Sequence, residues 1–280
     1  MAFALSCQHS ANHGLWYYLL LDYGRRKLSK PSDKLPAISG LARLFEPRVE
    51  ASYVAGLWSN ALVEGLAWRG VWPLGWEAAS AQTYIAPSWS WASHHGVAMG
   101  ATLDSANWRD IATVLDYHIE LKTQNPYGEV KGGWIMIEAP LVPLSPHDEP
   151  DNGYLRMKIT GDDSHGNFGN WDSIDAGHDA ERDFVNSLDH FALVLGQDRA
   201  IIREYEEEGE VDQQKDEEAG DEEAGDAARN DLWYFALLVV ATGNDSAQMR
   251  RVGWIGIDDV VFNERNVFED RSKFKTIKLV

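Results

Sequence analysis

The chain has 280 residues, of which 44% are hydrophobic and 25% charged, which is enough apolar sequence for one large core or two small ones. Its formal net charge of -19 argues against nucleic acid and anionic membranes as partners, because both require a positive protein surface. The single cysteine, Cys7, excludes an internal disulfide framework and favours a reducing, cytoplasmic location.

Much of the negative charge lies in one segment. Between Glu204 and Asp226 there are 13 acidic residues against one lysine, and the five-residue sequence DEEAG occurs there twice in tandem. Such a segment repels itself and cannot bury apolar surface. We therefore expect a disordered acidic insertion at about 204–230, on a body that is only mildly acidic.

The first third of the chain is predicted to be helical. The apolar run 15–21 has a length that suits a short buried helix or a strand, and we favour the helix. A second helix is expected to begin with Ser32 or Asp33 as its N-cap and to end at Pro47. A third helix is predicted over about 52–68, because apolar residues repeat there at i, i+4 spacing.

Tryptophan is unusually frequent, with 12 in the chain and six of them between Trp58 and Trp91. Large aromatic side chains bury much apolar surface, so this region is predicted to form core. Residues 86–93 read APSWSWAS. The alternation predicts a strand with Trp89 and Trp91 on one face and small residues on the other.

From about residue 110 the periodicity changes from helical to alternating, which predicts strands. In the first of them, Ile111, Leu115, Tyr117 and Ile119 are expected to share one face. Residues 161–170, rich in glycine, aspartate and asparagine, are predicted to be a flexible surface loop. Further strands are expected at 134–139, 155–159, 191–195, 232–241, 251–257 and 276–280.

These elements predict an α+β fold, in which N-terminal buried helices pack on a C-terminal, mostly antiparallel β-sheet, sandwich or partly open barrel. Residues 1–105 would form a helical, Trp-rich segment ending in the PSWSW strand. Residues 106–280 would form a β-rich segment that carries the acidic insertion. We expect the two segments to make one integrated domain.

The common catalytic signatures are absent: the chain has no G-x-S-x-G, P-loop, G-x-G-x-x-G or H-E-x-x-H motif. Ser88 or Ser90 could act as a nucleophile only beside a base that the fold would have to supply. His94 and His95 are adjacent, so on a strand they point to opposite faces and cannot easily share a metal ion. We therefore expect no catalytic residue, no cofactor and no metal site.

A binding role is the alternative for the PSWSW run. The face of Trp89 and Trp91, with His94 beside it, could stack on a ligand. The competing interpretation is that these tryptophans are packed in the core by their small neighbours, and we favour it.

Three segments, in this order and spacing, resemble the heterokaryon-incompatibility (HET) proteins of filamentous fungi. The first runs from WYYLLLDY at 16–23 to DKLPAISGLA at 33–42, the second is YVAGLW at 53–58, and the third is APSWSWAS at 86–93. The later FALVLG at 191–196 and RRVGW at 250–254 are similar to less distinctive strands of the family. The residues that carry the resemblance are Asp33, Leu35, Gly40, Gly56, Leu57, Trp58, Pro87, Ser88, Trp89, Ser90 and Trp91.

The resemblance implies a role in fungal non-self recognition and programmed cell death. In this family the incompatibility module, thought to resemble a Toll/interleukin-receptor-like domain, lies upstream of the segment matched here, and Met1 begins about where that module ends. The chain is thus expected to be a non-enzymatic scaffold or regulatory region whose partner is the missing HET module or another protein. An exposed apolar patch near the N-terminal helix should then mark the contact.

Two other functions stay open. A small-molecule or glycan binding module would use tryptophan faces that are open to solvent. A nucleotide-cleaving enzyme would need an acid beside backbone donors in a cleft. No membrane span is expected, because the longest apolar run is far shorter than the roughly 20 residues that a membrane helix requires.

Overall fold

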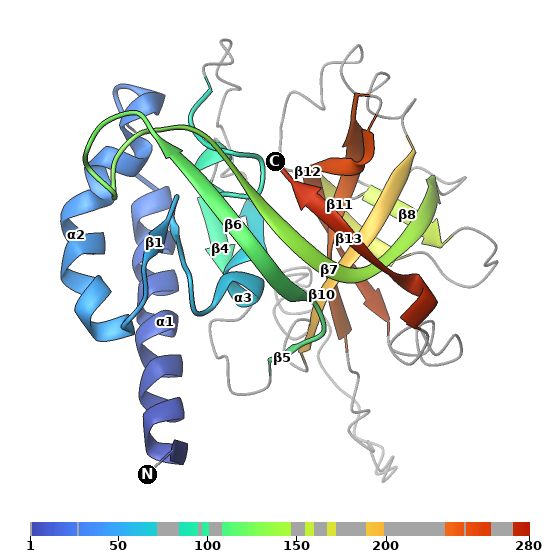
Figure 1. The fold of residues 1–280 in the computed structure, drawn as a ribbon, viewed down its shortest axis with the longest axis horizontal. Helices are drawn as coiled ribbons and strands as arrows, with labels where there is room; N and C mark the ends of the chain where they lie inside the picture. Colours follow the sequence, from blue (N-terminus) through green and yellow to red (C-terminus); the bar gives the residue numbers. More distant parts are fainter. Residues whose placement is uncertain are drawn as a thin grey trace, which may run out of the picture.

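The computed structural model describes residues 2–26, 28–71, 84–94, 97–100, 108–146, 155–159, 167–171, 189–198, 233–243, 245–258 and 271–280. The fold is α+β, as predicted. Helices near the N-terminus lie on one side of the molecule, and a large, mostly antiparallel sheet lies on the other (Figure 1).

Two long helices form the outer layer. Helix α1 spans Ala2–Gly24, and helix α2 spans Lys34–Val49 after a 3-10 turn, η1, at Pro31–Asp33. The helix predicted over 15–21 is therefore present within a longer one. Asp33 occupies the predicted N-cap position of α2. The predicted end at Pro47 is two residues too early. The helix continues to Val49 and ends there because the next residue, Glu50, takes a left-handed conformation.

The third predicted helix, over 52–68, is wrong. Strands β1 (Tyr53–Val54) and β2 (Leu57–Trp58) form a hairpin there, followed by a one-turn helix, α3 (Leu62–Leu66), and strand β3 (Trp68–Val71). Both turn residues of the hairpin have positive φ, 45° at Ala55 and 103° at Gly56. Such a two-residue turn reverses the chain, and a helix cannot pass through it. All six residues 53–58 are buried, so apolar residues occur there at every position. The i, i+4 spacing of apolar residues in this stretch was therefore not evidence of a helix face.

The strand predicted for the PSWSW run is also wrong. Residues 87–90 form turns, and Trp91–Ser93 form a 3-10 helix, η2. The Ser90 hydroxyl accepts a hydrogen bond from the Ala92 amide at 3.1 Å, which caps this short helix. Trp89, Ser90, Trp91 and Ala92 are all buried, so no alternation of faces exists. Strand β4 (Val97–Gly100) follows and pairs with β3.

Within the residues that the structure describes, nine strands build the main sheet, in the order β13-β7-β8-β9-β12-β11-β10-β5, with β6 paired to β7. Every strand predicted after residue 110 is present, most of them longer than expected. Their bounds are β5 Arg109–Asp110, β6 Thr113–Leu121, β7 Val130–Pro146, β8 Leu155–Ile159, β9 Asn167–Trp171, β10 His190–Asp198, β11 Trp233–Thr242, β12 Asp245–Asp258 and β13 Phe274–Leu279.

The long strand β7 lets this sheet curl into a partial ring. Residues 135–140 of β7 pair with β13, whereas residues 141–144 pair with β10. Strand β13 also pairs in parallel with β12 at Met249 and Leu279. All other pairings in the sheet are antiparallel, and β7, β10, β11, β12 and β13 thus form a closed path.

The curled sheet is buried on both faces at its centre. Along β11, Phe235, Leu237 and Val239 belong to a core cluster shared with the helical layer. The alternate residues Ala236 and Leu238 belong to a second cluster, made by β7, β10, β11 and β12. The first cluster draws residues from both 1–105 and 106–280, so a continuous core spans the predicted boundary.

Two predictions about the sheet need correction. Strand β6 has a bulge between Val114 and Asp116, which places Leu115 outside the alternation and leaves it 52% exposed. Residues 167–170 belong to β9 and pair with β8 and β12, so the loop predicted at 161–170 does not extend over them. The predicted acidic insertion at 204–230 lies outside the described residues.

Among the helices that the structure describes, none is both long and apolar enough to cross a bilayer.

The β1–β2 turn allows a stringent test of the hairpin. A Cβ atom at Gly56 would lie 2.3 Å from Trp91 Nε1, and the residue has positive φ. Gly56→Ala should therefore lower the free energy of unfolding by about 2–4 kcal/mol through backbone strain and overpacking. Gly40→Ala is the matched control, because nothing lies within 4 Å of its Cβ position in α2, and it should stabilise by about 0.5–1 kcal/mol. Urea unfolding measures both, and equal effects would contradict the assigned turn.

Candidate functional site

The three segments singled out in the sequence, 16–42, 53–58 and 86–93, meet at one buried place. We name it the motif junction and define it by its six residues, Lys34, Ala55, Gly56, Ser90, Trp91 and His94. The first comes from the start of α2 and the next two from the β1–β2 turn. Ser90 and Trp91 come from the PSWSW run, and His94 follows η2 as its C-cap. Segments separated in the sequence are thus joined by direct contacts.

Side chains of the PSWSW run and α1 satisfy the carbonyl groups of the β1–β2 turn. The Ser90 hydroxyl donates to the Ala55 carbonyl at 2.6 Å. The Gly56 carbonyl accepts from Trp91 Nε1 at 2.8 Å and from Trp16 Nε1 at 3.3 Å. These buried backbone acceptors would otherwise be costly, so the turn is stable only when the tryptophans are in place.

Lys34 brings a buried cation to the junction. Its Nζ donates to the carbonyl oxygen of His94 and lies 5.7 Å from the centre of the Trp91 ring. The Tyr23 hydroxyl donates to the Lys34 carbonyl at 2.7 Å, which fixes the start of α2. Burial lowers the pKa of Lys34 from 10.5 to about 7, since water no longer solvates the charged form.

A second buried cation joins the PSWSW run to the sheet. The Arg251 guanidinium donates to the carbonyls of Leu66 at 2.9 Å and Trp68 at 2.7 Å, and its Cζ lies 3.3 Å from the Trp68 ring centre. The Arg251 amide donates to the Ser88 hydroxyl at 3.0 Å. Ser88 in turn donates to the Val280 carbonyl, next to β13.

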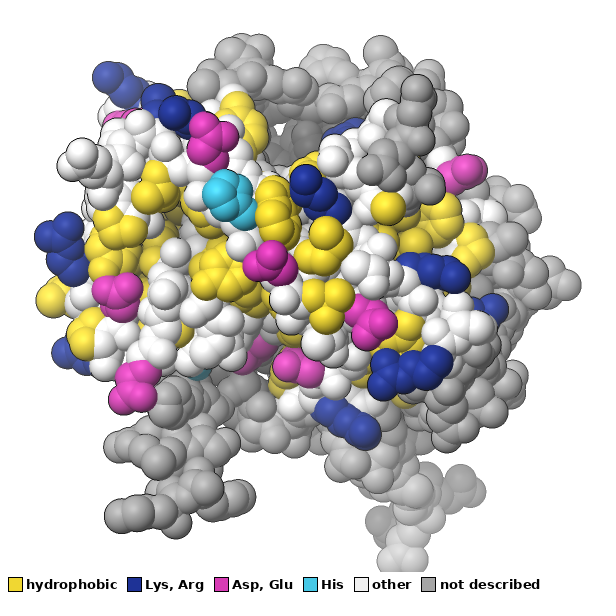
Figure 2. Space-filling model, in the orientation of Figure 1, with side chains coloured by type: hydrophobic (Ala, Val, Ile, Leu, Met, Phe, Trp, Pro, Cys, Tyr) yellow, Lys and Arg dark blue, Asp and Glu magenta, His cyan; other side chains and the backbone are white. Residues whose placement is uncertain are grey.

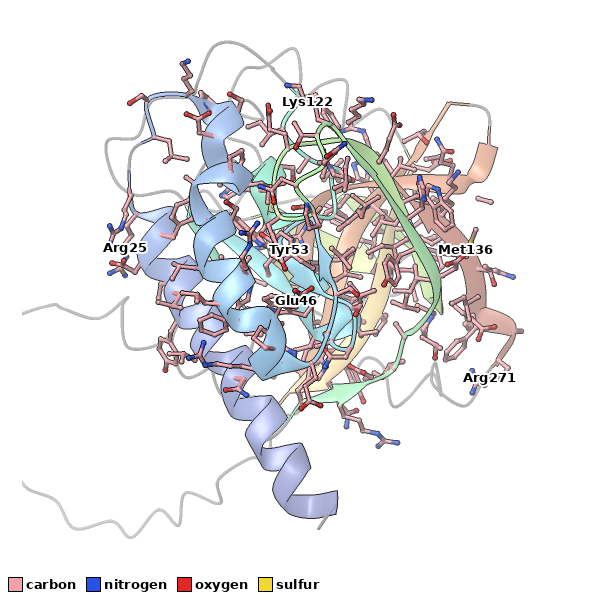
Figure 3. The ribbon with its side chains drawn as sticks, turned by 60° about the vertical axis from the view of Figure 1, so that its left-hand side comes forward. Arg25, Glu46, Tyr53, Lys122, Met136 and Arg271 are labelled. Atoms are coloured by element: carbon pink, nitrogen blue, oxygen red, sulfur yellow. The ribbon has the colours of Figure 1, made fainter. Side chains whose placement is uncertain are left out.

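An aromatic cluster surrounds the far side of the β1–β2 hairpin. The ring of Trp16 lies 5.3 Å from Trp58 and 6.1 Å from Tyr53, both edge to face. Beside it, the Tyr127 hydroxyl donates to Glu46 and so connects the β6–β7 loop to α2. Figure 3 labels Glu46, on α2, and Tyr53, in the neighbouring hairpin.

The candidate binding residues Trp89, Trp91 and His94 are 0%, 2% and 2% exposed. None of them presents a face to solvent, as ligand stacking would require. His95 lies outside the described residues. Of the other motif residues, Asp33 and Gly40 are exposed and Ser88 is intermediate. The rest are buried: Leu35, Gly56, Leu57, Trp58, Pro87 and Ser90.

Sequence reasoning missed the two buried cations, Lys34 and Arg251. A lysine inside the apolar motif DKLPAISGLA was the available signal for the first. The second had no local signal, because Arg251 acts on carbonyl groups more than 180 residues away. No group of metal-binding side chains occurs in the described part of the chain. The hydroxyl of Ser90 is already engaged with Ala55 and Ala92, so the arrangement is suited to holding segments together.

Exposed apolar side chains lie on the two outer helices, where a patch was predicted. Leu15 and Tyr18 of α1 are 52% and 54% exposed, and Leu41 and Leu44 of α2 are 41% and 59% exposed. The helices are antiparallel neighbours, joined for example by Asn12 Nδ2, which donates to the Arg48 carbonyl at 2.9 Å. We call these four residues the helix face.

Comparison of the chain with protein-family models, curated proteins and solved structures found no match.

The pKa of Lys34 predicts a specific pH dependence of stability. Between pH 7 and 10.5 the unfolded chain holds a proton on this lysine that the folded chain gives up, so the free energy of unfolding should rise with pH. One such group contributes at most about 1.4 kcal/mol per pH unit. In Lys34→Met this contribution should vanish, as urea unfolding at pH 7, 8 and 9 would measure.

The exposed Lys30→Met substitution controls for the loss of a lysine as such. If Lys34→Met keeps the wild-type slope between pH 7 and 9, Lys34 does not carry a lowered pKa.

Proposed function

We propose that this chain is a scaffold and regulatory region of a heterokaryon-incompatibility-type protein, acting by protein contact and not by catalysis. The observation that carries the proposal is the motif junction. The three sequence segments that resemble the family contact one another in a single buried cluster. Motifs that define the fold of a family are expected to make such contacts, which supports the proposal.

The character of the junction supports a structural use of these motifs. Its hydroxyl, indole and ammonium groups are directed at backbone carbonyls of Ala55, Gly56 and His94. A group that must attack or protonate a substrate has to reach it, within hydrogen-bond distance. In the junction these groups are buried and point at the chain itself.

The helix face supports a role in protein binding. Four large apolar side chains on neighbouring helices are exposed, and exposed apolar patches mark contact sites. We propose that a HET-type effector module is the partner, as the resemblance implies. The two helices are anchored by the junction through Lys34 and Trp16, so the binding surface is rigidly presented.

The test is calorimetric titration of the chain with a purified HET-type effector module. Leu41→Asp with Leu44→Asp should weaken binding at least about 100-fold, because two anchors lose their apolar contact. Leu115→Asp on β6 is the matched control, with an equally exposed leucine away from the helices, and it should leave the affinity unchanged.

Absence of binding by the wild-type chain would overturn the proposed partner. Hydrolysis of a nucleotide or an ester that Ser88→Ala or His94→Ala abolished, in a variant that still folds, would overturn the non-enzymatic role.

A further inference from the structure

A cluster of polar side chains lies where α1 meets α3. His13 and Tyr17 are four residues apart, so they share one face of α1, and each is 4% exposed. His13 Nε2 lies 3.1 Å from Oδ1 of Asn60, which precedes α3. A Cβ atom at Gly65 of α3 would lie 3.5 Å from the Tyr17 hydroxyl oxygen. The buried face of α1 therefore contacts the chain at 60–65, and Figure 1 shows α3 next to α1.

The Tyr17 hydroxyl is almost buried but has no hydrogen-bond partner. Within the described residues no group donates to it or accepts from it. The oxygen is not fully enclosed either, so it can be reached from the surface. A hydroxyl in such a place gains free energy from a ligand that hydrogen-bonds to it.

Two carboxylates act on this hydroxyl from two other elements. Glu64 belongs to α3 and Asp110 to β5. Burial raises the pKa of Tyr17 well above its usual value, and the negative charges of Glu64 and Asp110 raise it further. In Figure 2, aspartate and glutamate side chains lie at the lower centre of the molecule, where Figure 1 shows α3 and β5.

The Asp110 carboxylate is held in place and keeps its negative charge without a cation beside it. Trp108 Nε1 donates to Asp110 Oδ1 at 2.6 Å, and the backbone of Asp110 pairs with Gly196 on β10. Burial raises the pKa of Asp110, although the hydrogen bond from Trp108 lowers it, and no neighbouring cation contributes. Arg109 precedes it on β5, where successive side chains point to opposite faces.

We propose that Tyr17, Glu64 and Asp110 form a binding site for a primary ammonium group. An ammonium group has three N–H donors and no acceptor, which suits a phenolic oxygen and two carboxylates. Two negative charges at a partly buried place attract a cation more strongly than they would in open solvent. The group can belong to a lysine side chain of another protein or to a free aliphatic amine, and the inference does not depend on the partner proposed above.

A metal ion fits this place less well. The described part of the chain contains no group of three or more metal-binding side chains, and calcium requires six to eight oxygen ligands. A quaternary ammonium ion would bring charge but no N–H group for the Tyr17 hydroxyl. The unpartnered hydroxyl therefore favours a ligand that both carries positive charge and donates hydrogen bonds.

A titration followed by NMR tests the proposal on the full ¹⁵N-labelled chain. The probes are Nα-acetyl-lysine-N′-methylamide and 1,5-diaminopentane, each added at constant ionic strength. Amide resonances of Tyr17, Gly65 and Asp110 should shift, with a Kd of the order of 1 mM for at least one probe, as expected of a small site at the surface. Tighter binding of the lysine derivative would assign the site to a protein side chain, and tighter binding of the diamine to a free amine.

Two substitutions remove one acceptor each. Asp110→Asn should weaken binding at least about 10-fold, since it removes a charge, and Tyr17→Phe about 5-fold, since it removes a neutral oxygen. Asp110 is exposed, so Asp110→Asn keeps the fold even if Tyr17→Phe does not. Asp116→Asn on β6 is the matched control, because it removes an exposed carboxylate elsewhere and should leave the affinity unchanged.

Several results would overturn the proposal. One is the absence of shifts at these three amides with both probes at about 50 mM, well above the expected Kd. Another is an affinity that Asp110→Asn leaves as in the wild-type chain. Equal affinity for tetramethylammonium would show that charge alone is recognised, and tighter binding of CaCl₂ at the same amides would assign the site to a metal ion.

Discussion

The hydrogen bonds to the carbonyls of Ala55 and Gly56 are the contacts on which the helical layer depends. These two residues form a turn with positive φ at both positions, a conformation that glycine adopts readily but that is unfavourable for an L-residue such as Ala55 unless its surroundings stabilise it. Ser90, Trp91 and Trp16 provide that stabilisation from two other segments. Removing the Ser90 hydroxyl would take from the buried Ala55 carbonyl the donor described above, and removing either tryptophan would take one of two donors from the Gly56 carbonyl, so the stability of the turn is coupled to η2 and α1.

Two buried basic side chains connect this node to its neighbours. Lys34 is directed at a carbonyl and a tryptophan ring, and Arg251 at two carbonyls and another tryptophan ring. Carbonyl dipoles and ring faces offset the loss of hydration only in part, which explains the lowered pKa of Lys34. Tryptophan side chains thus fill the apolar core of this chain and also make cation–π contacts with buried basic side chains.

The sequence predicted the strands after residue 110 well, because alternation is a local property. It failed at Leu115, where a bulge interrupts the alternation, and at residues 53–58, where burial on all sides imitates a helical pattern. The PSWSW run was correctly assigned to the core, but its backbone was not, since turns are set by hydrogen bonds to distant carbonyls. The sequence shows the order of the three motifs along the chain, but it does not show that they contact one another in the fold.

The bond from Ser88 to Val280 joins residues 192 positions apart, and that from Arg251 to Ser88 spans 163. Contacts of such separation must overcome a large loop-closure entropy before they return any free energy. The ring of β7, β10, β11, β12 and β13 and the buried cations are therefore expected to form late in folding, in one cooperative step that expels water from both cores. Until that step Trp58, Trp68, Trp89 and Trp91, which are buried in the folded chain, remain exposed, and the chain is then most prone to aggregate.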